Sequence, residues 1–145
     1  MICQYSKEYN EYSYAACLYP PIAVKEATNQ ILGKNEYIFL LDVSGSMRGE
    51  RINLACEALT LFVRSLPVNS KFNIIPFSSG YKALFSQSKI YNEESMQEAL
   101  DLIADKDKFQ YGGTNLLNPL EDLTQNMSID PNYPRVVFIL TDGNI

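Results

Sequence analysis

Histidine is absent from this chain of 145 residues, and cysteine is scarce. The lack of histidine excludes Ser-His-Asp and Cys-His catalysis, and it also excludes metal sites with imidazole ligands. The three cysteines, Cys3, Cys17 and Cys56, form no Cys-x-x-Cys motif and therefore no paired metal ligands. Because Cys56 falls on the apolar side of a predicted helix, we expect it to be a buried thiol.

An excess of basic residues and long apolar runs are lacking as well. The formal net charge of −5 argues against a nucleic-acid partner, because phosphate binding usually requires a positive surface. The longest apolar runs, residues 38–41 and 136–140, are too short to cross a bilayer, so no membrane insertion is expected. The first residues do not resemble a secretory signal. Together with the odd cysteine count, this favours a reducing compartment, the cytoplasm. Nothing in the sequence indicates an oligomeric state.

From residue 36 onward, apolar residues follow patterns typical of alternating strands and helices. Apolar runs predict strands at 37–41, 71–77 and 135–140 and a short strand at 81–85. Helical spacing predicts helices at 51–66, from a cap at Asn92 to residue 103, and from residue 114 or 115 to 127. The expected buried face of the third helix consists of Leu117, Leu120, Leu123 and Met127, with Pro119 in or near its first turn. This alternation predicts an α/β fold with a doubly wound, mainly parallel, Rossmann-like sheet.

Residues 1–35 differ from the rest of the chain. They are rich in tyrosine and asparagine, and only residues 12–18 have the pattern of a strand before the Pro20-Pro21 pair. We interpret 1–35 as a linker or the remnant of a preceding domain, and 36–145 as the α/β domain.

Polar residues with oxygen-bearing side chains follow two of the predicted strands. Asp42, Ser44 and Ser46 follow the strand at 37–41, and Asp142 follows the strand at 135–140. Thr114 comes directly after Gly112-Gly113, before the third helix. Because crossovers in such sheets are right-handed, the carboxyl ends of the parallel strands share one rim, where ligands bind in open α/β sheets.

The five side chains offer two carboxylates, three hydroxyls and no nitrogen or sulfur ligand. Oxygen-only sites suit hard cations, which favours Mg²⁺ and leaves Mn²⁺ and Ca²⁺ as alternatives. Ser44 and Ser46 are two residues apart, so in an extended segment their side chains point the same way. A buried, unpaired Asp42 would be costly, and a cation at the rim would compensate its charge.

The motifs "DVSGS", "GGT" and "TDG" resemble the von Willebrand factor type A domain and its metal-ion-dependent adhesion site. All five positions of that motif have a counterpart here, namely Asp42, Ser44, Ser46, Thr114 and Asp142. The resemblance implies that the two serines and Thr114 coordinate the ion directly, while the aspartates act through water or hydrogen bonds. It also implies that this domain is incomplete, because the family continues with about two more strand–helix pairs after "TDGNI". The segment "YAACLYPP" is similar to inter-alpha-trypsin inhibitor heavy chains, in which a VIT domain precedes the A domain.

The resemblance implies binding rather than catalysis. A bound ion with one open coordination position would take an aspartate or glutamate carboxylate from a partner protein. One alternative is Mg²⁺-dependent phosphoryl transfer with Asp42 as nucleophile, although a second acidic residue beside Asp42 is lacking. Another is a structural interaction module with no functional metal. Arg48 and Arg51 are assigned to the solvated surface rather than to ligand contacts.

Overall fold

The computed structural model describes residues 2–6, 11–15, 34–125 and 130–144. The chain divides into two compact units, residues 1–30 and 31–145. In the first unit, β1 (Ile2–Ser6) and β2 (Glu11–Ala15) form an antiparallel pair, with Ile2 opposite Ala15 and Ser6 opposite Glu11. The strand predicted at 12–18 is therefore present in part, and its residues 16–18 lie outside the described ranges.

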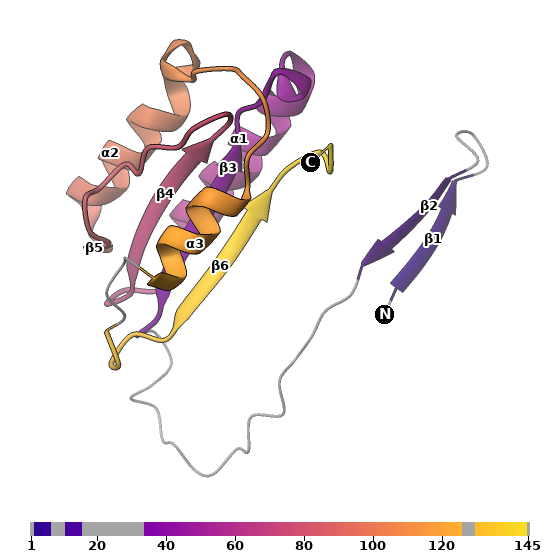
Figure 1. The fold of residues 1–145 in the computed structure, drawn as a ribbon. Helices are drawn as coiled ribbons and strands as arrows, with labels where there is room; N and C mark the ends of the chain where they lie inside the picture. The colour runs from indigo at the N-terminus through magenta and orange to yellow at the C-terminus, as the bar shows by residue number, and fades with distance from the viewer. Residues whose placement is uncertain (1, 7–10, 16–33, 126–129, 145) are drawn as a thin grey trace. The chain divides into compact units, whose positions relative to one another are not determined.

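The second unit contains a four-stranded sheet in the order β5-β4-β3-β6 (Figure 1). Its strands are β3 (Glu36–Asp42), β4 (Lys71–Phe77), β5 (Lys89–Ile90) and β6 (Arg135–Leu140). β3 pairs in parallel with both β4 and β6, whereas β5 is antiparallel to β4. The chain thus leaves the central strand β3 towards one side and later returns on its other side. The predicted doubly wound, mainly parallel α/β fold is confirmed.

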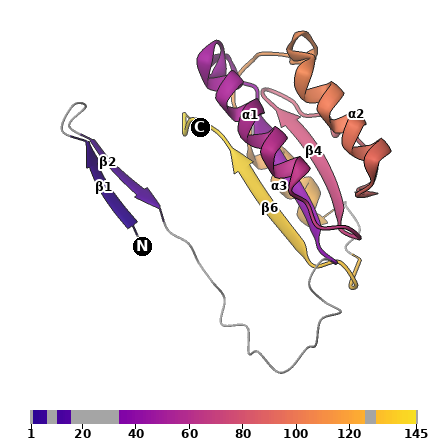
Figure 2. The same ribbon diagram turned by 180° about the vertical axis from the view of Figure 1, so that it is seen from behind.

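Three α-helices cover the two faces of this sheet. α1 (Glu50–Arg64) and α2 (Glu93–Ala104) lie on one face, and α3 (Leu117–Gln125) lies on the other (Figures 1 and 2). Two 3-10 turns, η1 (Gly45–Met47) and η2 (Lys106–Lys108), follow β3 and α2. Within the described ranges, no helix combines the length and the apolar character that a membrane span requires.

The alternation of side chains along β3 divides the core into two clusters. Phe39 and Leu41 face the α1 and α2 layer, and Ile38 and Leu40 face α3. All four are at most 1% exposed, which is the burial expected of a central strand covered on both faces. Cys56 is buried in the α1 cluster, as predicted, and this burial raises the pKa of its thiol.

The strand predicted at 81–85 is wrong. Only Tyr81 forms an isolated bridge, to Phe77, and the edge strand is β5 at Lys89–Ile90. Backbone bonds to β4 remain, from the Leu84 amide to the Ile74 carbonyl (2.8 Å) and from the Lys82 amide to the Pro76 carbonyl (3.3 Å). The side chain of Asn73, fully buried in β4, takes up the backbone groups of Phe85. It donates to the carbonyl of Phe85 (2.8 Å) and accepts from the amide of Phe85 (3.1 Å). The segment therefore runs beside β4 with a few backbone bonds and a side-chain contact rather than as a regular strand pair.

The third helix begins later than predicted. α3 starts at Leu117, because Asn115 ends the preceding loop with its side chain accepting from the amide of Asn118 (3.2 Å). Leu117 is 63% exposed, so its predicted burial is wrong, whereas Leu123 is buried and Pro119 lies in the first turn as predicted. Met127 lies outside the described residues.

Candidate metal site at the rim of the sheet

Four of the five predicted site residues, Asp42, Ser44, Ser46 and Asp142, lie where β3 and β6 end. These strands are parallel neighbours, with Leu41 opposite Leu140, so Asp42 and the residues after Leu140 leave the sheet at the same rim. The connections from β3 lead to β4 on one side and finally to β6 on the other. The site is therefore at the point of the rim where the strand order reverses, the usual position of ligand sites in such sheets.

Asp42 is completely buried and forms the base of the site. Its Oδ1 accepts from the amide of Ser44 (2.8 Å), and its Oδ2 accepts from the hydroxyl of Thr141 (2.7 Å). Both carboxylate oxygens are thus engaged, one by the loop after β3 and the other by the residue that follows β6. Asp42 holds the two segments together below the rim.

Ser44, Ser46 and Asp142 form the outer part of the site. The Oγ atoms of Ser44 and Ser46 lie 3.0 Å apart, and the Ser46 hydroxyl donates to Oδ1 of Asp142 at 3.4 Å. Ser44 is 1% exposed, and the Asp142 side chain is 10% exposed. Two hydroxyls and a carboxylate from segments 96 residues apart therefore meet at one point that still reaches the surface.

Among the residues that the structure describes, no hydrogen bond joins Thr114, the fifth predicted residue, to the other four, but its neighbours bond its loop to the loop after β3. The amide of Gly45 donates to the carbonyl of Gly112 (2.8 Å), and the amide of Asn115 donates to the carbonyl of Ser78 (2.7 Å). These bonds fix the Thr114 loop against the loop after β3 on one side and against the end of β4 on the other. Thr114 itself is half-buried.

The glycine at 112 is required by a close approach. A Cβ at this position would come within 2.7 Å of the Ser79 hydroxyl oxygen, which accepts from the amide of Gly113 at 2.7 Å. Any larger residue would force the Ser79 hydroxyl aside and disturb its hydrogen bond with the Gly113 amide. The first glycine of the "GGT" sequence is thus explained by local packing.

Sequence reasoning missed two residues of the site. Thr141 holds Asp42, and Arg51, in the first turn of α1, donates from Nη1 to the carbonyl of Ser46 (2.9 Å) and to Oδ2 of Asp142 (3.1 Å). The assignment of Arg51 to the solvated surface is therefore wrong in part: its side chain is 59% exposed, but it forms an ion pair with a site carboxylate. No local pattern reports a contact between residues 91 positions apart.

The carboxyl of Asp142 is adapted to remain ionised. Its pKa is lowered by the backbone amide and the side-chain amide of Asn144, by the Ser46 hydroxyl and by the charge of Arg51, against the opposing effect of burial. The turn that brings Asn144 back to Asp142 passes through Gly143, whose φ of 84° favours glycine. The carboxylate thus supplies a negative charge at the rim at neutral pH.

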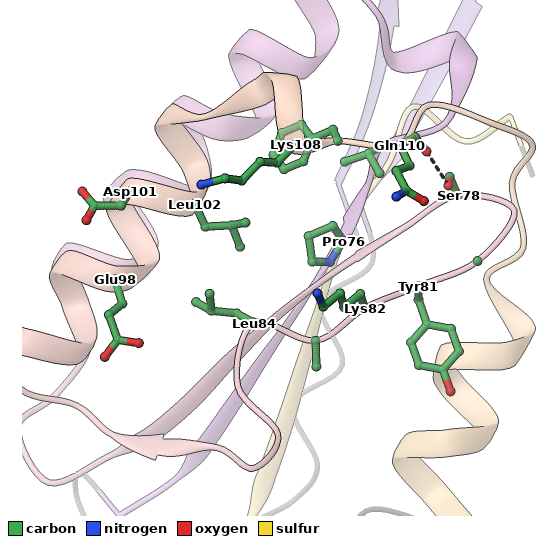
Figure 3. Close-up of a pocket in the computed structure, with 14 residues that line it drawn as sticks. Pro76, Ser78, Tyr81, Lys82, Leu84, Glu98, Asp101, Leu102, Lys108 and Gln110 are labelled. Carbon is green, nitrogen blue, oxygen red and sulfur yellow. Dashed lines mark hydrogen bonds between the residues drawn. The ribbon is translucent and has the colours of Figure 1, made fainter.

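A cleft of about 720 Å³ opens elsewhere in this unit, between α2 and the segment after β4 (Figure 3). Two of its charged groups are already paired on the surface, Lys108 with Asp105 (2.8 Å) and Glu98 with Lys89 (2.7 Å). None of the five predicted residues lines it. Among the residues that the structure describes, no three or more histidine, cysteine or acidic side chains converge as a metal cluster. The hydroxyl-rich rim is the site that fits the predicted motif.

The model of the von Willebrand factor type A domain family matches residues 35–145. The chain belongs to this family. A von Willebrand factor A domain-containing protein of Dictyostelium discoideum is 44% identical over 142 residues, which cover 98% of this chain and 15% of that protein. The human von Willebrand factor A domain-containing protein 5A is 37% identical over 136 residues, covering 88% of this chain and 17% of that protein. The chain thus spans about one sixth of the length of these relatives.

Solved structures show the same fold at lower identity. Proximal thread matrix protein 1 from the mussel byssus superposes with a TM-score of 0.62 at 22% identity, over 77% of this chain and 31% of that chain. Another structure of the same mussel protein, with a zinc-occupied MIDAS motif, has a TM-score of 0.55 at 19% identity, over 77% of this chain and 29% of that chain. These likenesses support the fold assignment. The von Willebrand factor type A domain is a protein-interaction module.

Proposed function

We propose that residues 36–145 bind a divalent cation at the rim and present it to an acidic group of a partner protein. Ser44, Ser46 and Thr114 would be direct ligands, and Asp42 and Asp142 would act through water or hydrogen bonds. The observation that carries the proposal is the convergence of the Ser44 and Ser46 hydroxyls with the Asp142 carboxylate above the buried Asp42.

The donor set fits Mg²⁺ in chemistry and in spacing. Every candidate donor is an oxygen, the ligand type that hard cations prefer. Oxygens around an octahedral Mg²⁺ lie about 2.0–2.1 Å from the ion, which places neighbouring ligands about 2.9 Å apart. The Oγ atoms of Ser44 and Ser46, joined by a hydrogen bond of 3.0 Å, are therefore already at a separation that two ligands of one ion can keep. Mn²⁺ and Ca²⁺ remain alternatives, and the zinc in the mussel protein's MIDAS motif belongs to that protein.

A protein carboxylate is the partner group that such a site favours. Hydroxyl ligands are neutral, so they leave much of the cation's charge uncompensated, and an open coordination position would attract an anion. The relatives are several times longer than this chain, so the identity of the partner is a matter for the whole protein. The assignment of residues 1–35 to a preceding VIT-like domain and the cytoplasmic location also stay predictions.

Phosphoryl transfer on Asp42 is disfavoured by the geometry of its carboxylate. A nucleophilic aspartate must expose an oxygen to the phosphorus atom. Asp42 is 0% exposed, and both of its oxygens accept hydrogen bonds. Its position suits a residue that holds the site together rather than one that attacks a substrate.

Substitution of Ser46 tests the ion site. Loss of an outer-sphere partner already weakens metal binding roughly 10–100-fold, so we expect Ser46→Ala to weaken Mg²⁺ binding at least about tenfold in a calorimetric titration. Ser65→Ala, at the exposed carboxyl end of α1, is the matched control and should bind as the wild type does. Equal Mg²⁺ affinity in Ser46→Ala and the wild type would refute the assignment.

The proposed carboxylate ligand is tested with acetate as a minimal probe. Added to the Mg²⁺-loaded chain, acetate should shift the amide NMR signals of residues 44–46. The same addition in EDTA should leave those signals in place. Shifts that persist in EDTA would instead favour an interaction module that works without a metal.

A further inference from the structure

Arg51 places a positive charge directly on the candidate site. From the first turn of α1, its guanidinium reaches Oδ2 of Asp142 at 3.1 Å and the carbonyl of Ser46 at 2.9 Å. Asp142 is the more enclosed partner of this ion pair, 10% exposed against 59% for Arg51. The guanidinium therefore occupies the solvent side of the carboxylate that the proposed function gives to the cation.

We propose that Arg51 competes with the divalent cation for Asp142 and thereby lowers the ion affinity of the site. A single carboxylate carries one negative charge. It cannot compensate the charge of a guanidinium and of a divalent ion at the same time as well as it compensates either one alone. Binding of the ion must weaken the Arg51–Asp142 pair, and the remaining repulsion between the two cations opposes binding further. This inference rests on the proposed function, because it concerns the regulation of the same site.

Arg51 is not needed to position the other groups of the site. Asp142 also accepts from the backbone and side-chain amides of Asn144, at 3.1 and 3.2 Å. The loop after β3 is held by Asp42 through the Ser44 amide and by the Gly45–Gly112 backbone bond. Removal of the guanidinium thus leaves these bonds in place and takes away a competing charge. A residue that only positioned the site would have the opposite effect on affinity.

The chain offers a matched control at Arg48. Its guanidinium lies over the ring of Tyr111, 4.8 Å from the centroid, and it is exposed. Arg48 lies three positions from Arg51 in the sequence, yet its described interaction is with an aromatic ring rather than with a site carboxylate. Replacing either arginine by methionine removes the same charge and keeps most of the side-chain length.

The test compares Arg51→Met, Arg48→Met and the wild type by calorimetric titration with Mg²⁺. Because the ion pair is partly exposed and screened, we expect Arg51→Met to bind Mg²⁺ about three- to tenfold more tightly, and Arg48→Met to bind as the wild type does. The difference in Mg²⁺ affinity between Arg51→Met and the wild type should shrink as the KCl concentration is raised, since added salt screens the repulsion between Arg51 and the ion. In EDTA, Arg51→Met should melt at a slightly lower temperature than the wild type, because the ion pair with Asp142 and the hydrogen bond to the Ser46 carbonyl are lost.

The outcomes separate this inference from the proposed function. Wild-type binding of Mg²⁺ with equal or weaker binding by Arg51→Met would overturn the competition and leave the ion site standing. An equal gain in affinity for Arg48→Met would show a general charge effect and would also overturn it. If the wild type binds no divalent ion, the proposed function fails and the inference fails with it.

Discussion

Asp42 is a charged side chain in a position that excludes water completely. Its tolerance there is explained by two hydrogen bonds, from the Ser44 amide and from the Thr141 hydroxyl. Without them, a buried carboxylate would be strongly destabilising. The same residue therefore has two separable contributions, a structural one through its hydrogen bonds and an electrostatic one through its charge.

Two substitutions of Asp42 separate these contributions. Asp42→Asn keeps an oxygen for the Ser44 amide and places an amide donor beside the Thr141 hydroxyl, which can rotate to accept. We expect the unfolding free energy of Asp42→Asn to lie within about 1 kcal/mol of the wild-type value. Asp42→Ala should lose about 1–3 kcal/mol of unfolding free energy, because the Ser44 amide and the Thr141 hydroxyl lose their acceptor. Both should lose most Mg²⁺ affinity, since the charge is gone. Urea denaturation in EDTA and calorimetry measure the two effects, and wild-type Mg²⁺ affinity in Asp42→Asn would contradict the electrostatic contribution.

At this scale, the sequence reports local spacing but not distant contacts. The Asp-x-Ser-x-Ser spacing predicts that Ser44 and Ser46 lie side by side, and their Oγ atoms do lie 3.0 Å apart. The extended segment assumed for this prediction is wrong, because Ser46 lies in the 3-10 turn η1. The contacts of Arg51 with Asp142 and of Thr141 with Asp42 depend on the register between β3 and β6. That register is a property of the folded sheet, so these two residues could not be assigned from the sequence.

At the scale of secondary structure, continuous strands and capped helices were predictable. The predicted ranges 71–77 and 135–140 coincide with β4 and β6. Asn92 caps α2 as predicted, its side chain accepting from the Ser95 amide at 2.8 Å. Where a side chain interrupted regular backbone pairing, prediction failed. Residues 81–85 have the composition of a strand, but Asn73 takes up the backbone groups of Phe85 that a ladder would use.

Asn73 is therefore expected to hold the segment after β4. In Asn73→Ala, the amide and the carbonyl of Phe85 lose their partners in a buried environment, which should cost about 2–4 kcal/mol of unfolding free energy. Urea denaturation measures the loss, and hydrogen exchange should show reduced protection at the Phe85 amide. The exposed Asn118, replaced by alanine as a control, should change stability by less than about 0.5 kcal/mol. A loss of stability in Asn73→Ala that equals the control would show that water replaces the side chain at no cost.

At the scale of the whole sheet, the end opposite to the candidate site is held by a buried ion pair. Glu36 begins β3, Arg135 begins β6, and their side chains meet at 2.7 Å with exposures of 9% and 10%. Ser88 donates to the second oxygen of Glu36 at 2.6 Å. β3 and β6 are thus joined at both ends, by this pair at the amino ends and by Asp42 and Thr141 at the carboxyl ends. The register between β3 and β6, which brings Asp142 to Ser46, is therefore fixed by contacts at both ends of the two strands.

Removing one partner of this ion pair should cost more unfolding free energy than replacing both partners by apolar side chains. Arg135→Met alone leaves Glu36 charged and buried, which we expect to cost about 3–5 kcal/mol in urea denaturation. The double variant Glu36→Met/Arg135→Met removes both charges and fills the space with apolar atoms, so it should be at least about 1 kcal/mol more stable than Arg135→Met. The exposed pair Lys89–Glu98, with side chains 47% and 40% exposed, is the control, and Lys89→Met should cost under about 1 kcal/mol. A double variant as unstable as the sum of its two single variants would show that Glu36 and Arg135 contribute independently, and that their mutual contact does not hold β3 and β6 in register.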